Sequence, residues 1–335
     1  MSRSSDTQIT RRTALALLSS AGASLAIGFP RSPTESGVES LRSLLPNFSD
    51  KSLALLQNLI EDPRYSERIP ATEAATLAQN ENTSVDKLML KLLPLAQSYS
   101  HAPISNFHVG VVVRGASGAL YPGANIEIPG QCLGFAVHAE QSALSNAYMH
   151  EERAVTALAV GAPPCGHCRQ FINEMSPDGE ILILTPDKPP TKLSAILPSA
   201  FGPAALGMKE GAFPVKEANL GLIAPSSDPL VSAALDAARK SYAPYSKSPS
   251  GVAIRSSSGR IYRGSYIENV AFNPSLSPLQ TALAALIAAG EPYTAISHVV
   301  LVELKGATIS QKPVTETVLR AIAPEAKLEV ITVQT

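Results

Sequence analysis

Leucines recur at helical spacing through the first part of the chain. Three series share a spacing of three or four residues, which places the side chains of each series on one face of a helix. The series are Leu41, Leu44 and Leu45; Leu53, Leu56 and Leu59; and Leu88, Leu92 and Leu95. Ser84 precedes the third series and suits an N-cap. We therefore predict a helical segment over residues 40–98, without a catalytic signature.

After residue 98 the pattern changes to short apolar runs that alternate with helix-compatible stretches. The apolar runs cover residues 109–113, 154–160 and 181–184, and the stretches between them cover 138–150 and 165–175. Strands that alternate with helices predict a layered α/β domain.

Prolines and glycines between residues 198 and 214 interrupt this pattern and predict that the first α/β domain ends there. We expect a leader over 1–39, the helical segment over 40–98, the first α/β domain over 99–205, a linker over 206–227 and a second domain over 228–335.

The second half contains a partial copy of the first, which appears when residue numbers are shifted by 141 (251 minus 110). Eight residues match without a gap: Gly110, Arg114, Ser117, Gly118, Tyr121, Gly123, Ile126 and Glu127 correspond to Gly251, Arg255, Ser258, Gly259, Tyr262, Gly264, Ile267 and Glu268. After a slip of two residues, HAEQSAL (138–144) faces SPLQTAL (277–283), which keeps Gln280 but replaces His138 with Ser277 and Glu140 with Leu279. The copy also lacks cysteine, so we expect it to keep the fold and to lack the chemistry.

Composition narrows the class of protein. Of 335 residues, 45% are hydrophobic and 16% are charged, as in globular proteins. Lysine plus arginine (27) nearly balances aspartate plus glutamate (28), so no overall positive field favours a nucleic-acid partner. Three cysteines do not support a disulfide framework.

The N-terminus offers two interpretations. Arg11 and Arg12 precede an acid-free apolar run over 14–29, which is typical of a twin-arginine export signal. The alternative is a disordered leader or an overlong start. The run is too short for a membrane span of about 20 residues, and we expect no membrane partner.

Residues 164–168 read PCGHC, which fits either a redox dithiol or part of a zinc site. Pro164 before the first cysteine, the absence of tryptophan and a His-x-Glu triplet upstream all count against the dithiol. Cys165 and Cys168 near a helix start lie on one face, where the helix N-terminus stabilises thiolates. His138 would be the third ligand.

The number of ligands predicts a catalytic zinc site rather than a structural one. Structural sites use four protein ligands, whereas catalytic sites use three and leave the fourth position to water. We expect Cys132 to pack as a small buried hydrophobe, not as a fourth ligand, and His167 to face away from the metal. Glu140, two residues after His138, is placed to act as the base.

HAE at 138–140 and PCGHC at 164–168 match the H-x-E and P-C-x-x-C signature of zinc deaminases. Further stretches resemble the two-domain, homodimeric bacterial cytidine deaminases: SNFHVG (105–110), GANIE (123–127), HAEQSA, PCGHCRQF, PYSKSPSGV (244–252) and ENVAFNPSLSPLQ (268–280). The resemblance covers about residues 40–335. It implies a three-layer α/β/α domain with a mixed sheet, duplicated along the chain behind the helical lead-in.

The resemblance also implies roles for individual residues. His138, Cys165 and Cys168 would bind one zinc ion, and Glu140 would shuttle protons. In the substrate-binding segment, Phe107 would stack on the pyrimidine, and Asn125 and Glu127 would hydrogen-bond the ribose 3′-hydroxyl, with Ile126 between them. Read without the family, Asn125 and Glu127 are turn residues.

By resemblance we expect hydrolytic deamination of cytidine and 2′-deoxycytidine in pyrimidine salvage, by a cytoplasmic homodimer. Two other deaminases share the signature. One acts on polynucleotides and needs a basic groove with aromatic platforms, and the other acts on deoxycytidylate and needs cations for the phosphate. A dithiol-disulfide oxidoreductase and a non-catalytic zinc module also stay open.

Overall fold

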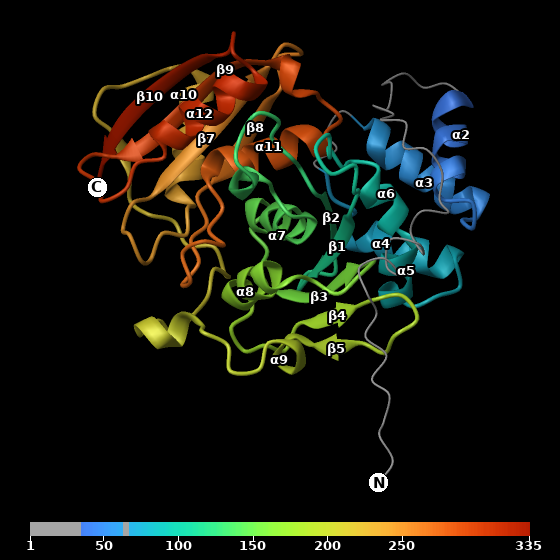
Figure 1. The fold of residues 1–335 in the computed structure, drawn as a ribbon. Coiled ribbons are helices and arrows are strands. Elements are labelled where there is room, and N and C mark those ends of the chain that lie inside the picture. The colour runs from blue at the N-terminus through green and yellow to red at the C-terminus, as the bar shows by residue number, and fades with distance from the viewer. Residues whose placement is uncertain (1–34, 63–66) are drawn as a thin grey trace.

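Two five-stranded mixed sheets, one from each half of the chain, carry the rest of the structure (Figure 1). The computed structural model describes residues 35–62 and 67–335. The first sheet has the order β2-β1-β3-β4-β5, with β1 Gly110–Gly115, β2 Leu120–Ala124, β3 Val155–Val160, β4 Leu182–Leu184 and β5 Thr191–Lys192. The second has the order β6-β10-β9-β7-β8, with β6 Gly221–Leu222, β7 Ser250–Ser256, β8 Ile261–Ser265, β9 Ile296–Leu304 and β10 Lys327–Gln334.

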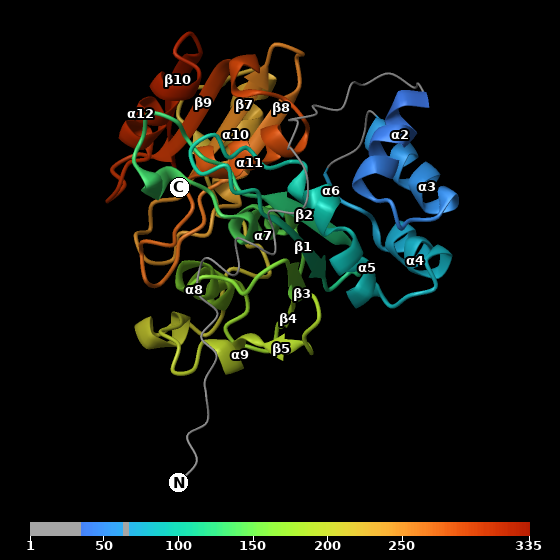
Figure 2. The same cartoon turned by 45° about the vertical axis from the view of Figure 1, so that its right-hand side comes forward.

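Short helices from the N-terminal segment cover the outer face of the first sheet (Figure 2). They are α2 Glu35–Leu44, α3 Asp50–Glu61, α4 Ala71–Asn80, α5 Val85–Lys91 and α6 Leu93–Gln97. Seven of the nine leucines in the predicted series are buried, and Leu44 and Leu59 are partly buried against the same core. Ser84 caps α5 by accepting a hydrogen bond from the Lys87 N–H. The leucine pattern did not reveal α4, in which small alanines make up most of the apolar positions.

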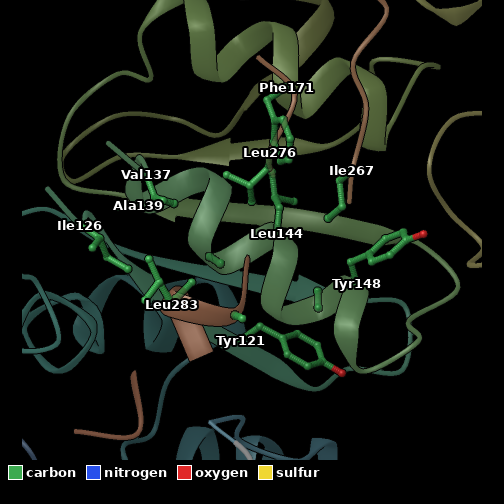
Figure 3. Close-up of a cluster of buried hydrophobic side chains, with 14 of the residues drawn as sticks. Tyr121, Ile126, Val137, Ala139, Leu144, Tyr148, Phe171, Ile267, Leu276 and Leu283 are labelled. Carbon is green, nitrogen blue, oxygen red and sulfur yellow. The ribbon is translucent and has the colours of Figure 1, made fainter. Parts of the chain in front are cut away.

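Helices from both halves lie between the two sheets and share one hydrophobic core. They include α7 Ala139–Met149, α8 Gly166–Met175, α11 Pro278–Ala288 and α12 Lys312–Ile322. Figure 3 shows side chains of both halves in this cluster, among them Tyr121 and Leu144 of the first half and Ile267 and Leu283 of the second. On the outer face of the second sheet, α10 Pro229–Arg239 packs against β7 and β9. A shared core of this kind fixes the two halves relative to each other.

The duplication seen in the sequence is confirmed in the fold. In each half the first two strands pair antiparallel, β1 with β2 and β7 with β8, and the third and fourth pair parallel, β3 with β4 and β9 with β10. The glycines Gly110 and Gly251 occupy equivalent places in the two halves. A Cβ at Gly110 would lie 2.4 Å from the Gln97 nitrogen, and one at Gly251 would lie 2.2 Å from the Ala238 nitrogen. Both halves therefore need glycine where the preceding helix touches the strand.

The region predicted as a linker contributes to the second sheet. Its strand β6 pairs antiparallel with β10, through Leu222 opposite Val333. The remaining short elements are α9 Leu193–Ile196 and the 3₁₀ turns Leu133–Phe135, Pro203–Leu206 and Tyr293–Ala295. Within 35–62 and 67–335, no helix has the length and apolar character that a membrane crossing requires. The predicted signal at Arg11 and Arg12 lies outside the described residues.

Candidate active site

Two helix N-termini converge on one point, and each carries a predicted metal ligand at its N-cap. His138 is the N-cap of α7, and Cys165 is the N-cap of α8, with Cys168 in the first turn of the same helix. The His138 Nδ1 lies 3.7 Å from the Cys165 Sγ and 3.2 Å from the Cys168 Sγ. Helix α7 follows β2 and helix α8 follows β3. Because β2 and β3 both pair antiparallel with β1, they run in the same direction, and the helix starts that follow them lie at the same edge of the sheet.

The environment of the two thiols favours a thiolate. The Cys165 Sγ accepts a hydrogen bond from the Cys168 main-chain N–H at 3.5 Å, as an N-cap does. A hydrogen bond from the Cys168 thiol lowers the pKa of Cys165 to about 4, against the opposing effect of burial. The same hydrogen bond, together with burial, raises the pKa of Cys168. One sulfur therefore carries a negative charge near neutral pH, as the capture of a cation requires.

The three side chains fit zinc. Their ligand atoms all lie within 4.8 Å of one another. Zinc binds nitrogen and sulfur at about 2.0–2.3 Å in a tetrahedron, so neighbouring ligand atoms lie about 3.3–3.8 Å apart. The observed separations from Nδ1, 3.2 and 3.7 Å, are close to this range, so small side-chain shifts would bring the three atoms to one ion. One imidazole and two sulfurs are also the donors that zinc prefers, and the described residues supply no fourth His, Cys, Asp or Glu to the group.

Glu140 lies beside the three ligands in the first turn of α7. Its side chain is only 6% exposed, and burial raises the pKa of its carboxyl above the usual value. The Cys168 thiol is a hydrogen-bond partner of this carboxyl. A carboxyl with a raised pKa next to a metal site can take up and release a proton near neutral pH.

The remaining cysteine differs from expectation, and the histidine between the thiols lies outside the ligand group, as expected. Cys132 is exposed, so its predicted burial is wrong: it precedes a surface turn, Leu133–Phe135, in which no side chain is buried. It is not part of the ligand group. The ring of His167 stacks on that of His138, with centroids 5.1 Å apart, but His167 does not belong to the ligand group either.

Asn125 and Glu127 hold the loop that carries Phe107. The Asn125 Oδ1 accepts a hydrogen bond from the Val109 N–H at 2.8 Å, and its Nδ2 donates to the Phe107 carbonyl at 2.8 Å. The Glu127 carboxylate accepts from the main-chain N–H groups of Ile104 and Ser105 at 2.7 and 2.9 Å. The predicted sugar and base contacts thus belong to one hydrogen-bonded unit.

Phe107 and Ile126 have opposite surroundings. The Phe107 side chain is 43% exposed, which suits a group that stacks on a ligand. Ile126 is 1% exposed and points into the shared core (Figure 3). Its main chain pairs with Val137 in both directions, at 2.9 and 2.8 Å, which links this segment to the residue before His138. A contact between Ile126 and a substrate would have to come from the main chain.

The second half repeats the carboxylate contact without the metal ligands. Glu268, the counterpart of Glu127, accepts hydrogen bonds from the Tyr245 and Ser246 N–H groups at 2.7 and 3.2 Å. Glu268 is 3% exposed, whereas Glu127 is half-buried. The carboxylate thus holds the turn before the first strand in both halves, and of the two only Glu127 is exposed enough to contact a ligand.

Comparison with known proteins agrees with this geometry. Residues 83–184 and residues 193–316 each match the family model described as the cytidine and deoxycytidylate deaminase zinc-binding region. A cytidine deaminase of Vibrio atlanticus is 41% identical over 272 residues, which cover 81% of this chain and 92% of that relative. This chain belongs to the cytidine deaminase family.

A second relative spans both halves, whereas a solved structure corresponds to about a third of the chain. A cytidine deaminase of Vibrio parahaemolyticus is 40% identical over 299 residues, covering 89% of this chain and all of that relative. Among solved structures, the cytidine deaminase of Mycobacterium tuberculosis is 28% identical, with a TM-score of 0.32, and covers 35% of this chain and 96% of its own. Family membership and the His138, Cys165 and Cys168 group together establish zinc as the cofactor.

Proposed function

We propose that the protein hydrolyses cytidine and 2′-deoxycytidine to uridine and 2′-deoxyuridine, with release of ammonia, in pyrimidine salvage. The observation that carries this is the buried Glu140 carboxyl beside a three-ligand zinc group at the meeting point of two helix N-termini. The relatives at 40–41% identity bear the name cytidine deaminase.

Bound zinc supplies a Lewis acid that makes water acidic enough to act as a nucleophile near neutral pH. Glu140 takes a proton from the attacking water as the new C–O bond forms at C4 of cytosine. It delivers this proton to N3, then takes the proton of the new C4 hydroxyl and passes it to the amine, which leaves as ammonia as the C4–N bond breaks and the C4 carbonyl forms. Its raised pKa suits both steps, because the same carboxyl must accept and donate protons in one reaction.

The segment around Glu127 supports a nucleoside as substrate. Burial raises the pKa of Glu127, but hydrogen bonds from the Ser105 hydroxyl and from the main chain of Ser105 and Ile104 outweigh it and lower the pKa below the usual value. Glu127 is therefore an anion at neutral pH, able to accept a hydrogen bond from a sugar hydroxyl and to repel a nearby phosphate. Exposed Phe107 and the Asn125 amide complete the substrate-binding side that we propose.

Turnover of a substrate series tests the function directly. We expect ultraviolet absorbance to report deamination of cytidine and deoxycytidine, and none of deoxycytidylate or single-stranded DNA under the same conditions. Deamination of deoxycytidylate at a similar kcat/KM would overturn the substrate assignment. Reduction of insulin by the same preparation would instead favour the dithiol reaction of Cys165 and Cys168.

We also propose that the chain forms a homodimer in which the second domain walls the site of the partner. Several large apolar side chains are exposed in the single chain, as expected for surfaces that a partner covers: Ile104, Phe107, Leu133 and Phe272. Light scattering coupled to size exclusion is expected to give twice the mass of 35.1 kDa. A monomer at working concentration would contradict the dimer without affecting the assignment of the zinc ligands.

For its location we propose the cytoplasm, in keeping with the role in salvage that the family resemblance implies. Export through the signal-like stretch at Arg11 and Arg12 is the alternative.

A further inference from the structure

Side chains of the second domain, which lacks the metal ligands, donate hydrogen bonds to main-chain carbonyls in three segments of the candidate active site. Gln280 reaches the segment before His138, Asn269 reaches the helix of the two cysteines, and Tyr293 reaches the segment of Glu127. All three donors are buried. Hydrogen bonds removed from water in this way define the position of the groups that they join.

The contact from Gln280 supports the zinc ligand His138. The Gln280 Nε2 donates to the Phe135 carbonyl at 3.1 Å, three residues before His138. The Gln280 Oε1 accepts from the Ser277 N–H at 3.0 Å, so the amide is held at both ends. Gln280 is the counterpart of Gln141 in the first half. It is retained in the copy, although Ser277 and Leu279 replace the nearby His138 and Glu140. This contact gives a physical reason for that retention.

The helix that carries both cysteines is held at two further points. The Asn269 Nδ2 donates to the Gln170 carbonyl at 3.0 Å, two residues after Cys168. At the end of α8, the fully buried Glu174 carboxylate accepts from the Tyr242 and Tyr245 hydroxyls at 2.7 and 2.5 Å. These tyrosines belong to the second domain, so α8 cannot rotate or slide without breaking contacts to it.

The third contact reaches the proposed sugar-binding segment. The Tyr293 hydroxyl donates to the Glu127 carbonyl at 3.3 Å. The Tyr293 ring also meets the His101 ring edge to face, with centroids 4.7 Å apart. His101 in turn pairs through its main chain with Asn125 and Glu127, at 3.0 and 2.8 Å. Tyr293 therefore contacts both stretches of the chain that pair here, at His101 and at Glu127.

We propose that Gln280, Asn269 and Tyr293 are positioning residues, through which the metal-free domain sets the geometry of the zinc and substrate groups in its own chain. Only the role of Tyr293 at the substrate-binding segment rests on the proposed function. The Gln280 contact has a counterpart in the other direction, because the Gln141 Nε2 donates to the Pro274 carbonyl at 3.0 Å. Of these two contacts, only the one from Gln280 ends beside the metal ligands.

Two variants test the contact beside the metal ligands and the contact to the substrate-binding segment separately. Gln280→Glu keeps the acceptor for Ser277 and removes the donor to Phe135. In the variant loaded with cobalt(II) in place of zinc, we expect the visible absorption bands of the metal to shift relative to the parent. We also expect the variant to lose its metal to a chelator about 10-fold faster than the parent does. Tyr293→Phe removes only the hydroxyl. We expect it to raise the KM for cytidine about 3- to 10-fold with the cobalt bands unchanged, as the loss of one hydrogen bond predicts.

Ser265→Ala is the matched control. The Ser265 hydroxyl, also fully buried in the second domain, donates to the Ala237 carbonyl at 2.7 Å on the side away from the site. We expect its thermal midpoint to fall as in the other variants, with the cobalt bands, metal release and KM as in the parent. If Gln280→Glu does not fold, Gln280→Met removes the same donor without adding a charge.

Two results would overturn the inference. The first is that folded Gln280 and Tyr293 variants match Ser265→Ala in all three readouts. The second is that Ser265→Ala shifts the cobalt bands as far as the Gln280 variant does. Failure of the proposed function is a different outcome, because it appears as absent cytidine turnover in the parent, whereas the cobalt spectrum needs no substrate.

Discussion

Replacing Glu140 with glutamine is expected to lower kcat for cytidine by about 10²- to 10⁴-fold while zinc remains bound. Glutamine keeps the size of the side chain and cannot accept or release the proton that the reaction moves. The three ligands His138, Cys165 and Cys168 are unchanged in this variant. Steady-state kinetics together with metal analysis of the purified variant checks both parts of the expectation.

Glu152→Gln is the control for this variant. Glu152 has the same 6% exposure as Glu140 and follows the far end of α7, where its carboxylate accepts a hydrogen bond from the Tyr121 hydroxyl at 2.9 Å. We expect it to lower stability and to leave kcat within about threefold, since loss of a buried hydrogen bond costs about 0.5–1.5 kcal/mol of folding free energy. A Glu140→Gln enzyme with parental kcat would remove the proposed proton transfer.

Replacing Cys168 with serine is expected to remove zinc and reduce deamination to background. Cys168 is buried, and its sulfur lies 3.2 Å from the His138 Nδ1, so no neighbouring side chain in the described group can take its place. Two protein ligands hold zinc far more weakly than the three of a catalytic site. Metal analysis after dialysis, with circular dichroism to confirm folding, measures the effect.

Cys132→Ser separates ligand loss from general sensitivity to cysteine substitution. Cys132 is exposed, is six residues before His138 and lies outside the ligand group. We expect this variant to keep about one zinc ion per chain and parental turnover. Loss of zinc from Cys132→Ser would show that the ligand set is wrong, whereas retention of zinc by Cys168→Ser would show that the site closes in another way.

The chemistry of this protein could be predicted from short stretches because metal ligands need particular atoms at particular spacings. A cysteine at a helix N-cap and another three residues later face the same way, whatever the rest of the fold is. Local pattern also predicted strands β1, β3 and β4 and helices α7 and α8 of the first domain, since apolar periodicity depends on side chains near in sequence, but it did not predict β2, β5 or α9. The alanine-rich helix α4 and the burial of Cys132 were not predicted, because neither depends on a local apolar pattern.

By itself, the sequence determined the family, the zinc ligand set and the duplication, and it put the proposed acid–base group two residues from a ligand, all through residue identity and spacing. Tertiary structure alone decided that the copy without ligands shares a core with the catalytic half, that Ile126 faces this core, and that Gln280 ends at the Phe135 carbonyl. These contacts join residues far apart along the chain, such as Gln280 and Phe135. Their partners are main-chain carbonyls, which every residue has, so no residue type marks them in the sequence.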